Sequence, residues 1–156
     1  MKTKYLTTAF TTALLSATCF INSANAGLIV TQDSDANSLV NNILGSGVAT
    51  SNISLTGANA AFGTFTGGIS AGIGIESGIM LSTGKVTDAV GPNSSDSTST
   101  NNQTAGDSQL SSISGHNTND AATLTFDFTS DGGDIFFNYV FASEEYNELM
   151  MYLLFF

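Results

Sequence analysis

A strict alternation of apolar and polar side chains near the carboxyl end constrains the fold of this chain more than any other feature. Residues 123–129 place Leu124, Phe126 and Phe128 on one face, and three threonines and Asp127 on the other. This period-two pattern is typical of a β-strand with one buried and one wet face. We therefore expect a half-buried strand here.

A second strand is expected over residues 135–142, after turn residues at 130–134. Both of its faces are apolar, with Ile135, Phe137, Tyr139 and Phe141 on one and Phe136, Val140 and Ala142 on the other. A strand that is apolar on both faces is typical of a sheet interior. The sequence thus predicts a hairpin of these two strands as the core.

One short helix is expected in the amino-terminal part, over residues 33–44. Leu39 and Ile43 lie four apart and so share one helical face, and the same spacing recurs one residue later. Asp33 and Asp35 can cap its first turn. We expect this helix to cover the interior strand.

Short β-prone runs alternate with glycines between residues 48 and 82. The runs are residues 53–55, 62–66, 73–75 and 79–81. This rhythm is typical of strands joined by tight turns. We predict an all-β fold, a jelly-roll-like β-sandwich with one short N-terminal α-helix.

A polar stretch interrupts this rhythm at residues 91–119. Ser, Thr, Asn and Gly supply 20 of its 29 residues. Such a composition buries little apolar surface. We expect a long mobile loop there.

The first 26 residues have the pattern of a secretory signal peptide. Lys2 and Lys4 precede an apolar run, and Ala24-Asn25-Ala26 supplies the small residues of a cleavage site. We expect cleavage after Ala26 and a single domain over residues 27–156, with no membrane insertion of the mature chain. A membrane anchor or a buried helix, and lipidation of Cys19, are the alternatives for this segment.

The charge balance excludes one class of partner. The chain has 13 acidic residues and three lysines, of which only Lys85 follows the expected cleavage site. Binding to nucleic acid requires clustered cations that neutralise phosphates. We expect no nucleic acid partner.

Several motifs together resemble the choice-of-anchor L domain family. They are Gly78-Ile79-Met80-Leu81-Ser82-Thr83-Gly84, Gly91-Pro92-Asn93, Asp120-Ala121-Ala122-Thr123-Leu124-Thr125-Phe126-Asp127-Phe128 and Asn138-Tyr139-Val140-Phe141-Ala142-Ser143-Glu144-Glu145-Tyr146. The last is the specific element. The resemblance implies a secreted bacterial protein whose domain is joined to varied C-terminal surface-sorting signals.

The chain departs from the family after the Ser-Glu-Glu-Tyr segment. Residues 149–156 are an apolar run where the family continues into an Asn-Asp-rich turn and further strands. We therefore expect a truncated or frame-shifted member, incomplete at the C-terminus and without its anchor.

One motif is typical of catalysis. Gly68-Ile69-Ser70-Ala71-Gly72 fits the nucleophile elbow of serine hydrolases, and His116 follows it in the chain. However, an elbow precedes a helix, whereas Ile73-Gly74-Ile75 has poor helix propensity. We therefore expect that this chain is not an enzyme.

Calcium is the only metal that the sequence suggests. Glu144, Glu145 and Asp127 are candidate oxygen ligands in a strongly acidic domain. The simpler interpretation is that Glu144 or Glu145 accepts hydrogen bonds from turn amides. We expect no required cofactor and keep calcium as an alternative.

Together these patterns predict a non-catalytic, secreted or cell-surface domain of structural or adhesive type. Its partner would be a surface or matrix component of unknown identity. The alternative is a carbohydrate-binding module that recognises a polysaccharide, with calcium if the acidic residues bind it. Such a module requires an exposed aromatic platform.

Overall fold

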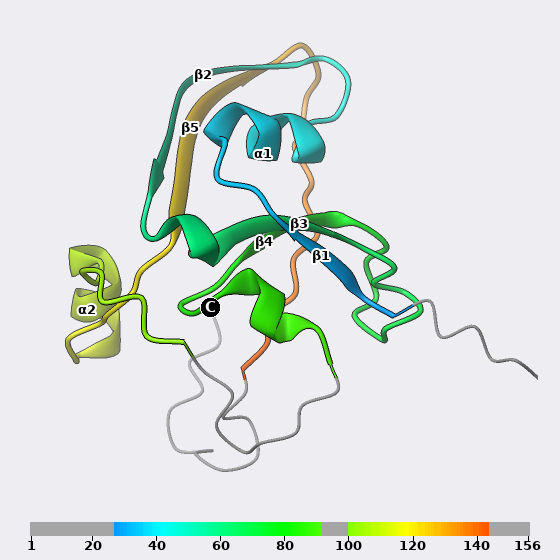
Figure 1. The fold of residues 1–156 in the computed structure, drawn as a ribbon. Coiled ribbons are helices and arrows are strands. Elements are labelled where there is room, and N and C mark those ends of the chain that lie inside the picture. Colours follow the sequence, from blue (N-terminus) through cyan, green and yellow to red (C-terminus); the bar gives the residue numbers. More distant parts are fainter. Residues whose placement is uncertain (1–26, 92–99, 144–156) are drawn as a thin grey trace, which may run out of the picture.

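The computed structural model describes residues 27–91 and 100–143. The expected signal peptide, Glu144, Glu145 and the apolar run 149–156 lie outside the described residues. Five strands form two antiparallel sheets (Figure 1). One has the order β1-β3-β4 and the other pairs β2 with β5: β1 (Ile29–Gln32), β2 (Val48–Thr56), β3 (Phe62–Thr66), β4 (Gly78–Leu81) and β5 (Thr123–Ser130).

Short helices connect the strands. They are α1 (Ala36–Ile43), α2 (Ser108–Ser114) and the 3-10 helices η1 (Asn59–Ala61) and η2 (Val86–Ala89). Helix α1 begins where the Asp35 carboxylate accepts the backbone N–H groups of Asn37 and Ser38, at 2.8 and 3.0 Å. The predicted helix and its cap are confirmed. The expectation that it covers a strand at residues 135–142 is wrong, because α1 packs on β2, β3 and β4 and residues 135–142 form no strand. In the part of the chain that is described, none of the helices has the length and hydropathy needed to cross a membrane.

The core lies where α1 meets both sheets. Leu39 of α1 packs with Ala61 and Phe62, and all three are buried. Partly buried side chains from both sheets and from the chain next to them surround this cluster: Leu55, Ala58, Ile79, Ala122 and Leu124. On the opposite side of the β1-β3-β4 sheet lies η2, whose Val86 is fully buried (Figure 1). Helix α1 and η2 therefore pack on opposite faces of this sheet, and β3 is its most buried strand.

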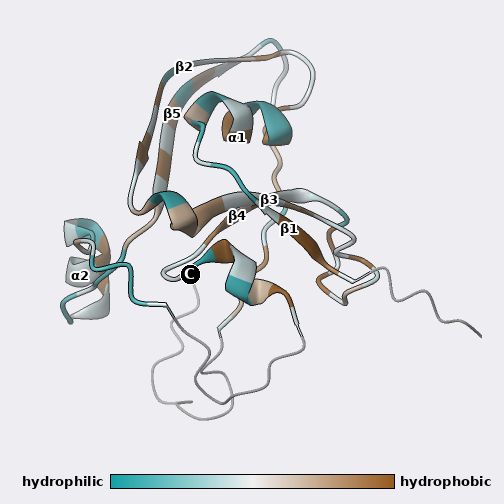
Figure 2. Cartoon of the chain, in the orientation of Figure 1, coloured by the Kyte–Doolittle hydropathy of each residue, from teal (hydrophilic) through white to brown (hydrophobic). Residues whose placement is uncertain are grey.

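Hydropathy along the ribbon follows this arrangement. Figure 2 shows apolar colour concentrated on β1 and β3, and apolar and polar residues alternating along β2 and β5. Alternation of this kind is typical of antiparallel strands with one wet face.

The predicted all-β class is confirmed by the two antiparallel sheets. The strand expected at 62–66 is β3, the run 79–81 lies in β4, and the run 53–55 lies within the longer β2. Residues 73–75 are part of the turn between β3 and β4 rather than a strand. Five described strands are fewer than the eight of a jelly roll, so that detail stays a prediction.

The predicted core hairpin is wrong. β5 forms over the expected residues, although Phe128 of its expected buried face is 53% exposed. Its partner is β2, with Val48 opposite Ser130 and Thr56 opposite Thr123. Residues 135–143 belong to neither sheet. Alternation determines which face of a strand is buried but not which strand lies beside it. The nine residues of β2 provide an alternative partner for β5.

The stretch 91–119 contains more structure than its composition indicates. Asp107 caps α2 by accepting the N–H groups of Gln109 and Leu110, and Gly115 ends it in the left-handed conformation. The sequence interpretation missed this helix because serines outnumber its apolar residues. The mobility of the stretch stays a prediction.

Candidate functional site

Among the described residues, the most exposed apolar feature is a segment that follows β5. Four of its aromatic side chains, Phe136, Phe137, Tyr139 and Phe141, are 68 to 87% exposed, and we call them the aromatic strip. The segment leaves the turn after β5 and runs past the β1-β3-β4 sheet (Figure 1). The expectation that these side chains are buried is wrong.

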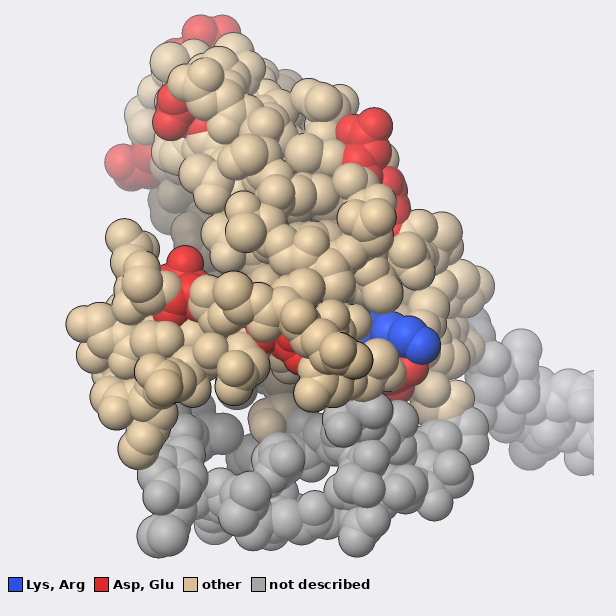
Figure 3. Space-filling view, turned by 60° about the vertical axis from the view of Figure 1, so that its left-hand side comes forward, with Lys and Arg blue, Asp and Glu red and all other residues tan. Residues whose placement is uncertain are grey.

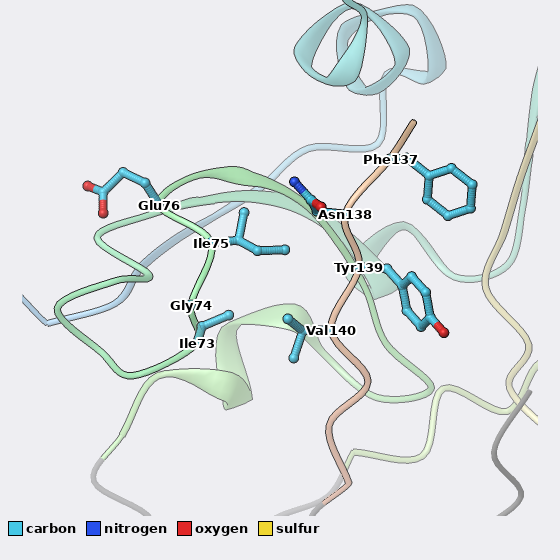
Figure 4. Close-up of a pocket in the computed structure, with 8 residues that line it drawn as sticks. All are labelled: Ile73, Gly74, Ile75, Glu76, Phe137, Asn138, Tyr139 and Val140. Atoms are coloured by element: carbon cyan, nitrogen blue, oxygen red, sulfur yellow. The ribbon is translucent and has the colours of Figure 1, made fainter. Parts of the chain in front are cut away.

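Side chains alternate along this segment as they do in an extended chain. In Figure 4, Phe137 and Tyr139 project to one side, and Asn138 and Val140 project to the other. The Phe137 and Tyr139 rings lie with centroids 6.1 Å apart and planes tilted by 39°. One side of the segment is therefore an exposed aromatic surface.

The other side of the segment borders an open groove of about 630 Å³. Residues 73–76 form its far wall, and Ile73 and Ile75 point toward Val140, whereas Glu76 points away (Figure 4). The groove thus has a mixed lining, in which Ile73, Ile75 and Val140 supply aliphatic surface and Asn138 projects to this side as a polar group.

Backbone hydrogen bonds hold the groove wall in place. The N–H of Gly68 donates to the carbonyl of Glu76 at 3.0 Å, and the N–H of Ile73 donates to the carbonyl of Gly68 at 2.8 Å. A Cβ atom on Gly68 would lie 2.0 Å from the Ile75 carbonyl oxygen. Packing therefore explains the first glycine of the elbow-like motif.

Ser70 and His116 do not form a catalytic pair. Ser70 lies in the connection between β3 and β4, and His116 directly follows α2. Figure 1 shows these two segments at opposite sides of the molecule. A nucleophile and its base must lie within hydrogen-bond reach. The arrangement gives the Ser70 hydroxyl no activation by His116.

The calcium candidates are only partly described. Asp127 is exposed on β5, where the Asn52 side-chain amide donates to its carboxylate. Glu144 and Glu145 lie outside the described residues. Within 27–91 and 100–143, no three acidic, His or Cys side chains gather to hold a metal ion. Calcium binding stays a prediction.

Charges are spread thinly over the surface. Figure 3 shows separate acidic side chains on the face in view and one cationic patch, which is Lys85. Most of the face in view is neutral. The described residues therefore present no cluster of cations that could neutralise phosphates.

Asp120 is the buried polar residue that sequence interpretation missed. Its carboxylate accepts the backbone N–H of Thr104 at 2.6 Å and that of Asn102 at 3.0 Å. The Thr104 N–H is the main reason that the pKa of Asp120 is lowered, and burial partly opposes this effect. Its partners precede it by 16 and 18 residues, so no local pattern reveals the contact.

Asp120 organises the chain around it rather than a ligand. The Asn102 side chain, placed by this contact, donates to the carbonyls of Thr83 and Gly84 at 3.1 and 2.9 Å. The carboxylate thus links residues 102–104 to the turn after β4. Because both carboxylate oxygens already accept hydrogen bonds, we assign Asp120 a structural role.

Comparison with known families gave one match. The family model described as the choice-of-anchor L domain matches residues 29–152, a range that includes both sheets and the aromatic strip. Comparisons with curated proteins and with solved structures gave no match.

Proposed function

This chain belongs to the choice-of-anchor L domain family, a surface-associated type of domain, and from that membership we propose a structural or adhesive role for it. In this proposal the chain is exported through residues 1–26 and acts as a non-catalytic domain outside the cell. Its partner is a component of the cell surface or of the extracellular matrix.

The exposure of the aromatic strip carries this proposal. Aromatic side chains are enriched in the cores of protein interfaces, and contiguous apolar surface on a soluble domain marks a binding site. Phe136 and Phe137 are the most exposed large hydrophobic side chains among the described residues. Leaving them in water is unfavourable, so a partner that covers them gains free energy.

Two further observations support a role without catalysis. Ser70 and His116 lie in segments at opposite sides of the molecule (Figure 1). Asp120, the described acid with the most complete set of bonds, is occupied by Thr104 and Asn102. A general base requires a carboxylate that can reach a substrate proton. The positions of these residues therefore support a binding role rather than a catalytic one.

A carbohydrate-binding module is the second candidate. It is favoured by the neighbouring Phe137 and Tyr139 rings, whose centroids are 6.1 Å apart. Exposed rings can stack against the apolar faces of sugars, and the Tyr139 hydroxyl group can hydrogen-bond a sugar hydroxyl. Calcium held by Glu144, Glu145 and Asp127 would make such binding dependent on the metal.

A location experiment tests the proposed role. The full chain is expressed in a bacterium that exports it, and its amino terminus and its accessibility on intact cells are measured. We expect a chain that starts at Gly27 and is digested by added protease without cell lysis. Retention inside the cell would contradict the proposed role.

A binding experiment separates the two candidates. The exported chain is incubated with purified matrix polysaccharides and, separately, with intact cells, with and without a calcium chelator. The double variant Phe137→Ser and Tyr139→Ser removes the paired rings, and Leu110→Ser on α2 is the matched control because Leu110 is also exposed. Polysaccharide binding lost only in the double variant favours the module. Binding to cells alone favours adhesion.

A further inference from the structure

We infer that residues 105–119, which we call the α2 loop, open from the domain as one unit while the core stays folded, and that the Asp120 carboxylate is the latch at the base of this loop. Such an opening gives the domain a second conformation that does not depend on which partner it binds.

The α2 loop is closed at its base by backbone contacts. Its two ends meet in an antiparallel bridge between Ala105 and Asn119. Next to this bridge, the N–H of Ala121 donates to the carbonyl of Ala105 at 3.1 Å. Surface loops of about 6–16 residues whose ends lie close together often form compact units, and the α2 loop falls within this length.

Polar groups of the α2 loop hold it together internally. Asp107 caps α2, and its carbonyl accepts the hydroxyl groups of Ser111 and Thr118 at 2.8 and 3.0 Å. The oxygens of these two hydroxyl groups lie 2.7 Å apart, and the Thr118 N–H donates to the Ser111 hydroxyl at 3.1 Å. The beginning and the end of the loop are thus bonded to each other, so that the loop can move as one piece.

Burial of apolar side chains contributes little to keeping the α2 loop closed. Helix α2 has no buried residue, and its Leu110 and Ile113 are both exposed. Figure 1 shows α2 at one side of the molecule, away from α1. By contrast, α1 buries Leu39 and Val40 completely. Because burial of apolar surface is the dominant source of stability, the α2 loop opens at a lower free energy than the core does.

The Asp120 side chain fastens the base of the loop. Its carboxylate accepts the backbone N–H groups of Asn102 and Thr104 and the Thr104 hydroxyl group. Gln103 and Asp120, which flank the loop, have φ of 57° and 53°, in the region that non-glycine residues rarely adopt. Such conformations persist only where surrounding contacts hold them. Release of the carboxylate therefore relieves backbone strain at both ends of the loop, and these two residues are its hinges.

Opening of the α2 loop separates the walls of a groove of about 290 Å³. Leu110 and Thr118 of the loop form part of its lining. Leu81 and Ala121, which belong to the body of the domain, form another part. The open conformation thus gives access to a side of the groove that the loop faces in the closed conformation.

Amide hydrogen exchange tests whether the α2 loop is a separate unit. Exchange is followed by nuclear magnetic resonance on the exported full chain, at urea concentrations below the unfolding transition. We expect the N–H groups of Ser111 and Gly115 to exchange at a rate that hardly depends on urea, because a local opening exposes little surface. Exchange in α1 should be slower and should rise steeply with urea. An equal urea dependence in both helices would overturn the inference.

Two substitutions separate the latch from the core. Leu39→Ala weakens the core, so exchange in α1 should rise by about tenfold or more while exchange in α2 stays unchanged. Asp120→Asn removes a bond of the latch, so exchange in α2 should rise by about tenfold, and the exposed Asp131→Asn should leave it unchanged. Faster exchange of α2 in Leu39→Ala would show that loop and core open together. The urea series on the wild-type chain decides the same question if Leu39→Ala does not fold.

A disulfide across the base tests whether the loop opens as a whole. Ala105→Cys and Asn119→Cys, combined with Cys19→Ser, lie opposite each other in the antiparallel bridge and therefore within disulfide range. Oxidation should slow exchange in α2 by about tenfold or more relative to the reduced form of the same variant. Equal exchange in the oxidised and reduced forms would show that α2 unwinds inside a closed loop, and would overturn the latch.

Discussion

Asp120 and Thr104 are joined by three hydrogen bonds. The Asp120 carboxylate accepts the backbone N–H and the hydroxyl group of Thr104 at 2.6 and 3.1 Å, and the Asp120 N–H donates to the Thr104 carbonyl at 3.1 Å. Asp120 makes these bonds with φ of 53°, a conformation that non-glycine residues rarely adopt. The contacts compensate for that backbone conformation and fix the start of the chain that leads into β5.

Replacement of this carboxylate should destabilise the domain. Asp120→Asn substitutes an amide, which donates, for one of two oxygens that both accept. One partly buried backbone N–H then loses its partner, and we expect the Tm to fall by several degrees. Thermal unfolding followed by circular dichroism measures this change. The exposed Asp131→Asn is the control, and an equal Tm for both variants would refute the role of Asp120.

Acid should weaken the domain through the same residue. Because the pKa of Asp120 is lowered in the folded chain, its stabilising effect is complete above about pH 4, the ordinary range for aspartate, and is lost as the pH falls through the lowered value. Unfolding in denaturant at a series of pH values measures this dependence. Asp120→Asn should show a smaller loss at low pH, and a loss equal to that of the wild type would argue against this assignment.

Shortening the Leu39 side chain of α1 should strongly reduce the stability of the domain. Leu39 is fully buried between α1 and both sheets, so Leu39→Ala leaves a cavity at their junction. Comparable substitutions reduce the free energy of unfolding by about 2–5 kcal/mol. Urea unfolding measures the loss. Leu110→Ala, at a side chain that is 48% exposed, should cost much less, and similar losses would place the core elsewhere.

Gly68 should tolerate no side chain. A Cβ atom there would overlap the Ile75 carbonyl oxygen, which is backbone and cannot move aside without breaking the turn. We expect Gly68→Ala to destabilise the domain by about 1–3 kcal/mol, in the range of overpacked sites. Gly45→Ala, where the added atom meets nothing within 4 Å, is the control. Ser70→Ala should leave the free energy of unfolding unchanged, because the motif has a packing role.

Local signals predicted much of the fold. The cap of α1, the strand β3 and the alternating strand β5 follow from side-chain spacing and hydrogen-bonding chemistry within a few residues. Helix α2 carried comparable signals, with Asp107 before it and Gly115 after it, but its serine-rich composition indicated a loop. β1 gave too short an apolar run to be recognised. For α2, composition thus indicated a loop, whereas the residues at its two ends indicated a helix.

Partners distant in sequence could not be predicted. β5 pairs with β2 rather than with residues 135–142, because alternation does not select a neighbour. Asp120 contacts Asn102 and Thr104 across a segment that contains α2, and no local pattern encodes the path of this segment. The candidate site was misjudged for the same reason. Large apolar side chains indicated a core. The exposure of the aromatic strip instead depends on how the strands pair, because none of the described strands covers these side chains.

Amide hydrogen exchange of residues 135–142 tests the central claim most directly, which is that this segment is open in the single domain and covered by its partner. Exchange is measured by mass spectrometry on the exported chain at low concentration and again after assembly on cells. The account predicts rapid exchange in the dilute chain and strong protection after assembly. Protection that is already complete in the dilute chain, or rapid exchange in both states, would contradict it.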